Sequence, residues 1–529
     1  MQLAQYSDSA LSLIAPICAL LAAVITRRII LSLAIGIIVG TLFLVELDIT
    51  KGGSYLGASV IGLVWSDGAI NTWNVYIIGF LLLLGVMTKL MSLSGASSAF
   101  AHWASQRIKT RRGASMLTAG LSFLVFVDDY FHSLAVGNLA RPITDKAQIS
   151  RSKLAYLLDS TAAPVCVLMP LSSWGAYIVT IIGGLLATHA ITEISPLAAF
   201  VSMIPMNFYA VFALVFALAV AYWNINLGAM RKEEQRAQSG ELYDHHKGMP
   251  AGMVETDNEQ VDLNAGPWGL VLPILAMTLA CFSLFIITGA NALDGDQGFS
   301  LMAALENTDV TLSLLLGGVV GLAVCLYFNF KQGQSLGLIA NASIRGMQTM
   351  KGAILILLFA WTISGVISDL ETGKYLASQI GDSIPYQLLP LIVFILSGIM
   401  AFSTGTSWGT FGIMLPIAAD MAAGTNISMM LPMLAAVLAG SVFGDHCSPI
   451  SDTTILSSTG AACHHLDHVA TQLPYALLIA AISGFSYVVY GYSENVWIGL
   501  GFGLAVLLAV VTILVKHPRF AKHTVFNPV

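Results

Sequence analysis

Apolar segments long enough to cross a lipid bilayer recur along almost the whole chain, and this feature limits the possible folds most strongly. A hydrocarbon core about 30 Å thick requires roughly 20 apolar residues in each helix. Only 10% of the 529 residues are charged, whereas soluble domains carry about 25%. The sequence therefore predicts an all-α polytopic membrane protein with about 11 spans. The predicted spans are residues 10–26, 29–47, 73–93, 153–187, 196–222, 267–289, 310–330, 352–370, 429–461, 472–490 and 495–515.

Four apolar stretches differ from a simple transmembrane span in their length or in having polar residues at their centres. Segments 153–187 and 429–461 are too long for one crossing and have polar, proline-containing centres, so each is predicted to be a broken transmembrane helix. Stretches 113–140 and 386–420 contain Asp128-Asp129 and the run from Ser403 to Ser407 in their middles.

The distribution of Lys and Arg predicts how the chain crosses the membrane, because cytoplasmic loops are enriched in both residues. Basic groups occur at 27–28, 107–112, 141–153, 231–236, 331–351 and 516–522. All of them can lie in the cytoplasm only if 113–140 enters and leaves from that side and 386–420 from the outer side. Both stretches are therefore predicted to be re-entrant hairpins. The expected location is a bacterial inner membrane, with the N-terminus outside and the C-terminus in the cytoplasm.

The two halves of the chain resemble each other in sequence. The segment from Asp159 to Pro164 aligns with that from Gly444 to Pro449 at an offset of 285 residues. With five spans and one hairpin in each half, the repeats at 1–223 and 265–529 are predicted to be inverted, as in many secondary transporters. The polar segment 224–264 between them is expected to be a solvated cytoplasmic linker without a core.

Irregular backbone inside a membrane is tolerated only where protein buries it or where it lines a wet cavity. The two hairpin tips and the two helix breaks are therefore predicted to meet at one site. Aspartates at this depth are costly and mark function or a partner. The candidate ion- and substrate-binding residues carry oxygens that suit a hard cation such as sodium. They are Asp128, Asp129, Asp159, Ser160, Thr161, Ser403, Thr404, Thr406, Ser407, Asp445, Ser448, Ser451, Asp452, Thr453 and Thr454.

Three of these aspartates, Asp159, Asp445 and Asp452, are the expected sodium ligands. A desolvated carboxylate can exchange a proton for a metal ion, which is the minimal chemistry of proton-coupled antiport. No separate cofactor is expected, only sodium and protons as transported or coupling ions. The alternative for Asp159 and Asp445 is the capping of a half-helix, and for the 403–407 run it is a flexible polar tip.

Several histidines and a tryptophan lie in or near these segments. His132 and Trp408 are expected to pack, although contact with a substrate is the alternative. His446 is a candidate pH sensor. The group His464, His465 and His468 is expected to form a solvated face at the cytoplasmic end rather than a metal site.

Three runs of residues resemble the NhaC-type sodium/proton antiporter family. They are Phe126–Tyr130, Leu158–Pro164 and, most specifically, Gly444–Thr454, and the resemblance extends over about residues 10–515. It implies membership of the wider ion-transporter superfamily, with paired hairpins, a scaffold, a moving transport domain and frequent homodimers. It also implies sodium- or proton-coupled exchange or uptake of organic acids and amino acids as possible activities.

The first functional hypothesis is therefore sodium/proton antiport by alternating access. The alternative is a sodium- or proton-coupled transporter of a small amino acid or carboxylate, with the 403–407 run and half-helix amides holding the carboxylate. Opposed hairpins argue against a channel. An enzyme is not expected, because no zinc signature, nucleophile elbow or phosphate loop occurs at a plausible position. The formal charge of −6 indicates no nucleic-acid partner.

Overall fold

The computed structural model describes most of the chain. The described residues are 3–26, 28–66, 68–123, 125–126, 128–170, 172–253, 266–293, 300–372, 375 and 385–516. Arg27, Val127, Leu171, the end of the expected linker at 254–265 and the basic tail beyond Lys516 lie outside these residues.

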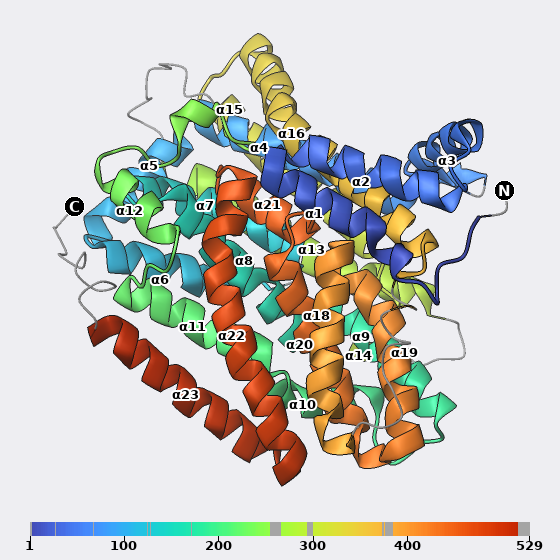
Figure 1. Cartoon of the computed structure of the whole chain (residues 1–529). Coiled ribbons are helices and arrows are strands. Elements are labelled where there is room, and N and C mark those ends of the chain that lie inside the picture. Colours follow the sequence, from blue (N-terminus) through green and yellow to red (C-terminus); the bar gives the residue numbers. More distant parts are fainter. Residues whose placement is uncertain are drawn as a thin grey trace.

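Helices make up nearly all of the described structure, which confirms the predicted fold class (Figure 1). Among the described residues, the strands are β1 (Trp65–Ser66) and β2 (Ala69–Ile70), which form one short antiparallel ladder. Eight helical segments are long and apolar enough to cross a membrane, or nine if one bent pair counts as a span, so the exact number of spans stays a prediction. The eight include α4 (Thr72–Leu93), α13 (Trp268–Ala292), α15 (Val310–Lys331), α16 (Leu336–Asp369), α22 (His465–Ser493) and α23 (Val496–Lys516).

The bent pair corresponds to the predicted span at 196–222. Helix α10 (Pro196–Met203) continues through η2 (Ile204–Met206) and meets α11 (Phe208–Trp223) at an angle of 55°. Pro205 lies in this turn and cannot donate a backbone hydrogen bond, which favours the bend.

Both predicted helical hairpins are present. The first consists of α6 (Arg111–Ser122) and α7 (Asp129–Lys146), and the second of α18 (Leu389–Thr404) and α19 (Ser407–Thr425). At the second tip Gly405 has φ +71°, a left-handed conformation that glycine adopts without strain. A Cβ atom at Gly405 would lie 2.5 Å from the carbonyl oxygen of Ile450, so the absence of a side chain lets this tip contact the second helix break.

Both broken helices are also present. The first is α8 (Arg151–Leu168) followed by α9 (Ser173–Thr188), and the second is α20 (Met430–Cys447) followed by α21 (Asp452–Gly460). Each break contains a proline, which cannot continue the hydrogen-bond ladder, and then a serine that caps the next half-helix. Ser172 Oγ accepts from the amide of Gly175 at 2.9 Å, and Ser451 Oγ accepts from the amide of Thr454 at 3.2 Å.

The breaks show that the predicted register between the repeats is wrong. Pro164 lies inside α8, whereas Pro449 lies in the second break. The equivalent positions are Pro170 and Pro449, followed by the caps Ser172 and Ser451, at an offset of 279 rather than 285 residues. The sequence comparison paired Pro164 with Pro449. A proline can, however, lie inside a membrane helix when the freed backbone groups find other partners, so a proline alone does not mark a break.

Several of the long helices pack against one another. Helix α4 packs on α15 and α16, and α13 packs on α15. Figure 1 places α8, α20 and α21 near the middle of the molecule and α23 along one edge. The remaining elements are short or peripheral: η1 (Ala10–Leu13), α1 (Ile14–Thr26), α2 (Ile29–Leu44), α3 (Ile49–Gly62), α5 (Ala96–Arg107), η3 (His245–Lys247), α14 (Leu301–Glu306), η4 (Tyr386–Leu388) and η5 (Ile427–Met429).

The first part of the expected linker is packed against the protein, contrary to the expectation of a solvated segment. Helix α12 (Met230–Gln238) buries Met230 completely, and Glu234 is 2% exposed. Glu234 pairs with Arg111 at 2.7 Å and with Lys153 at 3.8 Å, and it accepts a hydrogen bond from the Ser150 amide at 2.8 Å. The polar composition of this segment reflects specific ion pairs with the ends of α6 and α8, which sequence alone did not reveal.

Candidate functional site

The two hairpin tips and the two breaks meet at one place, as the sequence predicts. Tyr130, just after the first tip, donates to Asp452 at the second break. Ser407, at the second tip, donates to Asp445 at 3.0 Å. Trp174, just after the first break, donates from Nε1 to Asp129 at 2.8 Å. Four segments far apart in sequence thus bring their polar side chains together inside an otherwise apolar molecule.

Asp445 is the carboxylate whose surroundings best suit an exchangeable ion. It lies in the last turn of α20 and is fully buried. Its Oδ2 accepts from Ser407 Oγ at 3.0 Å and from Thr453 Oγ1 at 3.2 Å, and Ser451 Oγ lies 2.9 Å from the Thr453 hydroxyl. Its Oδ1 is buried and has no hydrogen-bond partner among the residues that the structure describes.

A buried carboxylate oxygen without a partner is costly unless the group holds a proton or a cation. The hydroxyls around Asp445 can accept as well as donate, and the nearby end of α20 presents backbone carbonyls. The arrangement can therefore hold either a proton or a hard cation on the same carboxylate.

Asp159 has a different environment. It lies inside α8 rather than at a break, so the capping alternative is wrong for this residue. Its Oδ2 accepts from Gln472 Nε2 at 2.5 Å and from Thr454 Oγ1 at 3.1 Å, and His468 Nε2 lies 3.1 Å away. Its Oδ1 accepts from Ser457 Oγ at 3.3 Å. These partners bind the carboxylate from several sides and join α8 to α21 and α22.

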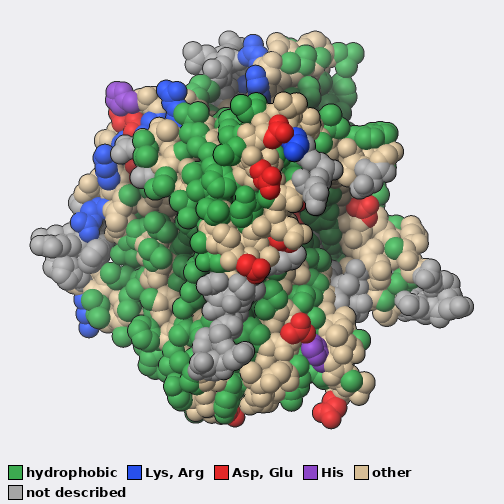
Figure 2. All heavy atoms as spheres, turned by 45° about the vertical axis from the view of Figure 1, so that its right-hand side comes forward, with side chains coloured by type: hydrophobic (Ala, Val, Ile, Leu, Met, Phe, Trp, Pro, Cys, Tyr) green, Lys and Arg blue, Asp and Glu red, His purple; other side chains and the backbone are tan. Residues whose placement is uncertain are grey.

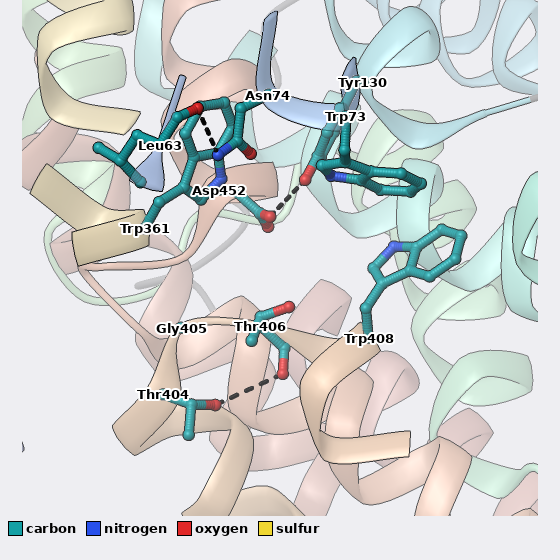
Figure 3. Close-up of a pocket in the computed structure, with 10 residues that line it drawn as sticks. All are labelled: Leu63, Trp73, Asn74, Tyr130, Trp361, Thr404, Gly405, Thr406, Trp408 and Asp452. Carbon is teal, nitrogen blue, oxygen red and sulfur yellow. Dashed lines mark hydrogen bonds between the residues drawn. The ribbon is translucent and has the colours of Figure 1, made fainter. Parts of the chain in front are cut away.

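Asp452 is the first residue of α21 and faces a cavity of about 240 Å³. Its Oδ1 accepts from the Thr453 amide at 2.9 Å, and its Oδ2 accepts from the Tyr130 hydroxyl. Figure 3 shows this pair on one side of the cavity, with the hairpin tip of Thr404, Gly405 and Thr406 across from it. The remaining lining residues are Leu63, Trp73, Asn74, Trp361 and Trp408.

Asp128 and Asp129 are adjacent in sequence but have different partners, because adjacent side chains point in different directions. Asp128 caps α7 through a hydrogen bond from the Phe131 amide at 3.1 Å. Asp129 accepts from Trp174 through Oδ1, while its buried Oδ2 has no hydrogen-bond partner within the described part of the chain. Asp128 thus has a structural role, and Asp129 is a second buried carboxylate next to the site.

Several predicted hydroxyls have hydrogen-bond partners other than Asp445. Thr161 donates to the Leu157 carbonyl at 2.6 Å and contacts Ser122, while Ser403 and Thr404 donate to carbonyls of their own helix at 2.7 and 3.0 Å. Ser160 lies in α8 beside Tyr156 rather than in a break. Ser448 donates to the Phe402 carbonyl at 2.7 Å and thereby joins the second break to the second hairpin.

Three of these histidines, His132, His446 and His468, are buried, whereas His464 and His465 are partly exposed. His468 lies against Asp159, and His465 Nε2 lies 2.7 Å from the carbonyl oxygen of Pro449, so the expected solvated face is wrong for His468. His446 contacts the Tyr209 hydroxyl through Nδ1 at 3.0 Å. His132 contacts Val125 and Thr161 and has the expected packing role.

The three aspartates expected to bind sodium have different surroundings. Among the described residues no group of three or more His, Cys, Asp or Glu side chains is arranged to hold a metal ion. Asp159 is contacted by four residues of α21 and α22, whereas Asp445 accepts from two hydroxyls. The sodium assignment of Asp159, Asp445 and Asp452 stays a prediction.

Sequence reasoning missed His468 and Gln472 as partners of Asp159, and Trp73 and Trp361 as cavity residues. His468 and Gln472 could have been recognised from the sequence, because two polar residues four positions apart lie on the same face of a helix. Trp73 and Trp361 could not have been recognised as cavity residues, because single aromatic residues near span ends are common in membrane proteins.

Comparison with known proteins gives a family. The model of the "Na+/H+ antiporter family" matches residues 165–492, which contain both hairpin α18–α19 and the second break. An uncharacterized protein of Haemophilus influenzae is 48% identical over 522 residues, covering 98% of this chain and 97% of the relative.

Two further relatives match over shorter regions. The malate-2H(+)/Na(+)-lactate antiporter of Bacillus subtilis is 29% identical over 185 residues, which are 34% of this chain and 38% of the relative. The arginine/ornithine antiporter ArcD of Halobacterium salinarum is 30% identical over 157 residues, 29% of this chain and 30% of the relative.

Proposed function

Because the chain belongs to the Na+/H+ antiporter family and is therefore a secondary transporter, we propose that it exchanges sodium for protons at Asp445. The observation that carries this proposal is the buried Oδ1 of Asp445, which has no hydrogen-bond partner among the described residues, while Oδ2 of the same carboxylate accepts from the hydroxyls of Ser407 and Thr453. Sodium and the proton compete for one carboxylate, so only one of them occupies it at a time.

Competition between sodium and the proton for one carboxylate results in their exchange if the site faces the two sides of the membrane alternately. Ser407 belongs to the hairpin α18–α19, whereas Asp445 and Thr453 belong to the broken helix α20–α21. A relative movement of these elements would change the number of oxygens around the ion. Sodium binding would thus favour the arrangement in which the Ser407 hydroxyl contacts Asp445.

We also propose the orientation predicted from the basic loops, in an inner membrane with the N-terminus outside. In this orientation Leu63 and Asn74, which line the cavity, lie on the outer side, and α12 with its Glu234 ion pairs lies on the cytoplasmic side. Figure 2 supports this placement, because Lys and Arg side chains gather along one margin of a face that is mostly hydrophobic. A homodimer is the proposed assembly, carried over from the family resemblance.

A second candidate function is sodium- or proton-coupled transport of a small organic solute. The cavity of about 240 Å³ beside Asp452 favours it, because a single water molecule takes up only about 30 Å³ and a bare sodium ion is smaller still. The names of the two shorter-matching relatives, which include lactate, malate, arginine and ornithine, are in agreement with an organic solute.

Proteoliposomes with an internal pH dye test both candidates. A sodium gradient is imposed with and without a panel of amino acids, amines and carboxylates. If sodium alone moves protons, and Asp445→Asn stops this movement, the exchange proposal stands. If protons move only after an organic solute is added, the second candidate replaces it.

A further inference from the structure

The cavity beside Asp452 gathers an unusual share of the protein's aromatic residues. Three of its nine tryptophans, Trp73, Trp361 and Trp408, line it together with Tyr130. They come from α4, α16 and α19 and lie far apart in sequence. Figure 3 shows the rings of Trp73 and Trp408 next to each other on one side of the cavity and Trp361 near Asp452.

The aromatic wall is held in place by further contacts. Trp73 and Trp408 lie with ring centroids 5.6 Å apart at an angle of 70°. Trp408 also contacts Tyr177 at 4.8 Å and Trp174 at 6.0 Å between centroids. A positioned indole attracts a cation through the negative potential of its ring face and also contacts an apolar body well.

The charge in this cavity is negative. Asp452 is 7% exposed and accepts from the Tyr130 hydroxyl and the Thr453 amide. A carboxylate has about four acceptor positions, which is more than these two donors use. The described lining residues include no Lys, Arg or His. A carboxylate solute would therefore face a like charge without a cationic partner, whereas an ammonium group would meet an opposite charge.

We propose that this cavity binds an organic ammonium ion, with its amino group at Asp452 and its apolar body against Trp73, Trp361 and Trp408. The proposal rests on the second candidate function, transport of an organic solute. The sequence predicts that Asp445 and Asp452 belong to one ion- and substrate-binding site. The proposal instead places the inorganic ion at Asp445 and the organic cation at Asp452. Thr453 contacts both acids, through its amide to Asp452 and its hydroxyl to Asp445, so occupancy of one can affect the other.

Isothermal titration calorimetry on the full chain in detergent tests the site with three probes of the same length: n-butylammonium, n-butyrate and n-butanol. We expect n-butylammonium to bind at least about tenfold more tightly than the other two. Asp452→Asn should abolish the preference for n-butylammonium over n-butanol. Trp73→Leu and Trp408→Leu should each weaken n-butylammonium binding by about tenfold, whereas Trp73→Phe should keep most of it.

Trp497→Leu is the matched control, because Trp497 lies on α23 and is 68% exposed. An equal loss of binding in this control, or binding of n-butyrate or n-butanol as tight as that of n-butylammonium, would overturn the ammonium site. Unaltered thermal melting of each variant shows that it is folded, and Trp73→Phe keeps the test decisive if a leucine variant fails to fold.

Sodium-driven proton movement is measured on the same preparation. Proton movement without n-butylammonium binding would overturn the ammonium site alone. Binding without sodium-driven proton movement would support the site and overturn exchange at Asp445.

Discussion

Ser407 donates a hydrogen bond to Asp445 Oδ2 at 3.0 Å, across 38 residues of sequence. This contact joins the tip of a hairpin to the end of a half-helix and leaves the other carboxylate oxygen of Asp445 buried without a partner among the described residues. Both features suit the proposed exchange of sodium and a proton at Asp445.

Asp445→Asn is expected to abolish sodium-driven proton movement, by at least about a hundredfold, because an amide carries no exchangeable charge. Asp452→Asn is expected to abolish proton movement coupled to an organic solute, because Asp452 is the carboxylate that lines the cavity, while leaving membrane insertion intact. Proton flux in dye-loaded proteoliposomes measures both. Asp420→Asn is the matched control, since Asp420 on α19 is 73% exposed in its side chain. Full activity of Asp445→Asn and Asp452→Asn would refute the site assignment.

Ser407→Ala should raise the sodium concentration for half-maximal flux by about tenfold and lower the maximal flux less. One neutral oxygen ligand and one hydrogen bond to the carboxylate are lost, worth about 1 kcal/mol or somewhat more. Thr425→Ala is a suitable control, because the Thr425 hydroxyl donates only to the Met421 carbonyl of its own helix and is exposed. An unchanged sodium dependence would show that Ser407 does not contact the ion.

Asp159→Asn is expected to act mainly on stability. The amide would present a donor to Gln472 and His468 in place of an acceptor, which costs about 1–3 kcal/mol when a buried group is left unsatisfied. A lower melting temperature by fluorescence-detected size exclusion checks this. Proton flux, normalised to folded protein, should fall at least tenfold less than in Asp445→Asn. The reverse order would make Asp159 the ion-carrying group.

Gly405→Ala should destabilise the second hairpin more than a left-handed conformation alone explains. An alanine at φ +71° costs about 1–2 kcal/mol, and its Cβ would also lie 2.5 Å from the Ile450 carbonyl. Gly333→Ala isolates the first effect, because Gly333 has φ +73° and no atom within 4 Å of an added Cβ. Equal losses of melting temperature in the two variants would show that the close contact at Ile450 does not matter.

Glu234→Gln should destabilise the protein by about 3 kcal/mol at neutral pH, because a buried ion pair loses one partner. Burial by itself raises the pKa of Glu234, but the charges of Lys153 and Arg111 outweigh it and hold this pKa below its usual range. The stabilisation is therefore present above the unfolded pKa of about 4.3 and is lost as the pH falls through the lower folded value.

Melting temperatures measured from pH 7 down to pH 3 check this behaviour. The difference between the wild type and Glu234→Gln should shrink as the pH falls below about 4. Glu241→Gln, on an exposed position of the same segment, should show no such difference. A difference that stays constant over this range would refute the role of the Glu234 charge.

The fold class and the approximate position of the candidate site could be predicted from the amino-acid sequence. Long apolar segments predict membrane helices because unsatisfied backbone groups are excluded from lipid, and the same rule explains why polar, irregular stretches such as 403–407 must meet inside the protein. The sequence also pointed to Asp445 and Ser407, since a buried carboxylate and nearby hydroxyls are the oxygens that a hard cation needs.

Which of these oxygens lie close together could not be predicted, because it depends on contacts between distant helices. Periodicity gives the face of a helix but no distance between helices, so Asp159 could not be separated from Asp445 until His468 and Gln472 were placed against it. The same holds for Glu234, whose partners Arg111 and Lys153 lie about a hundred residues away. A contact between distant segments depends on how the chain packs, and packing depends on the shape of every helix between them.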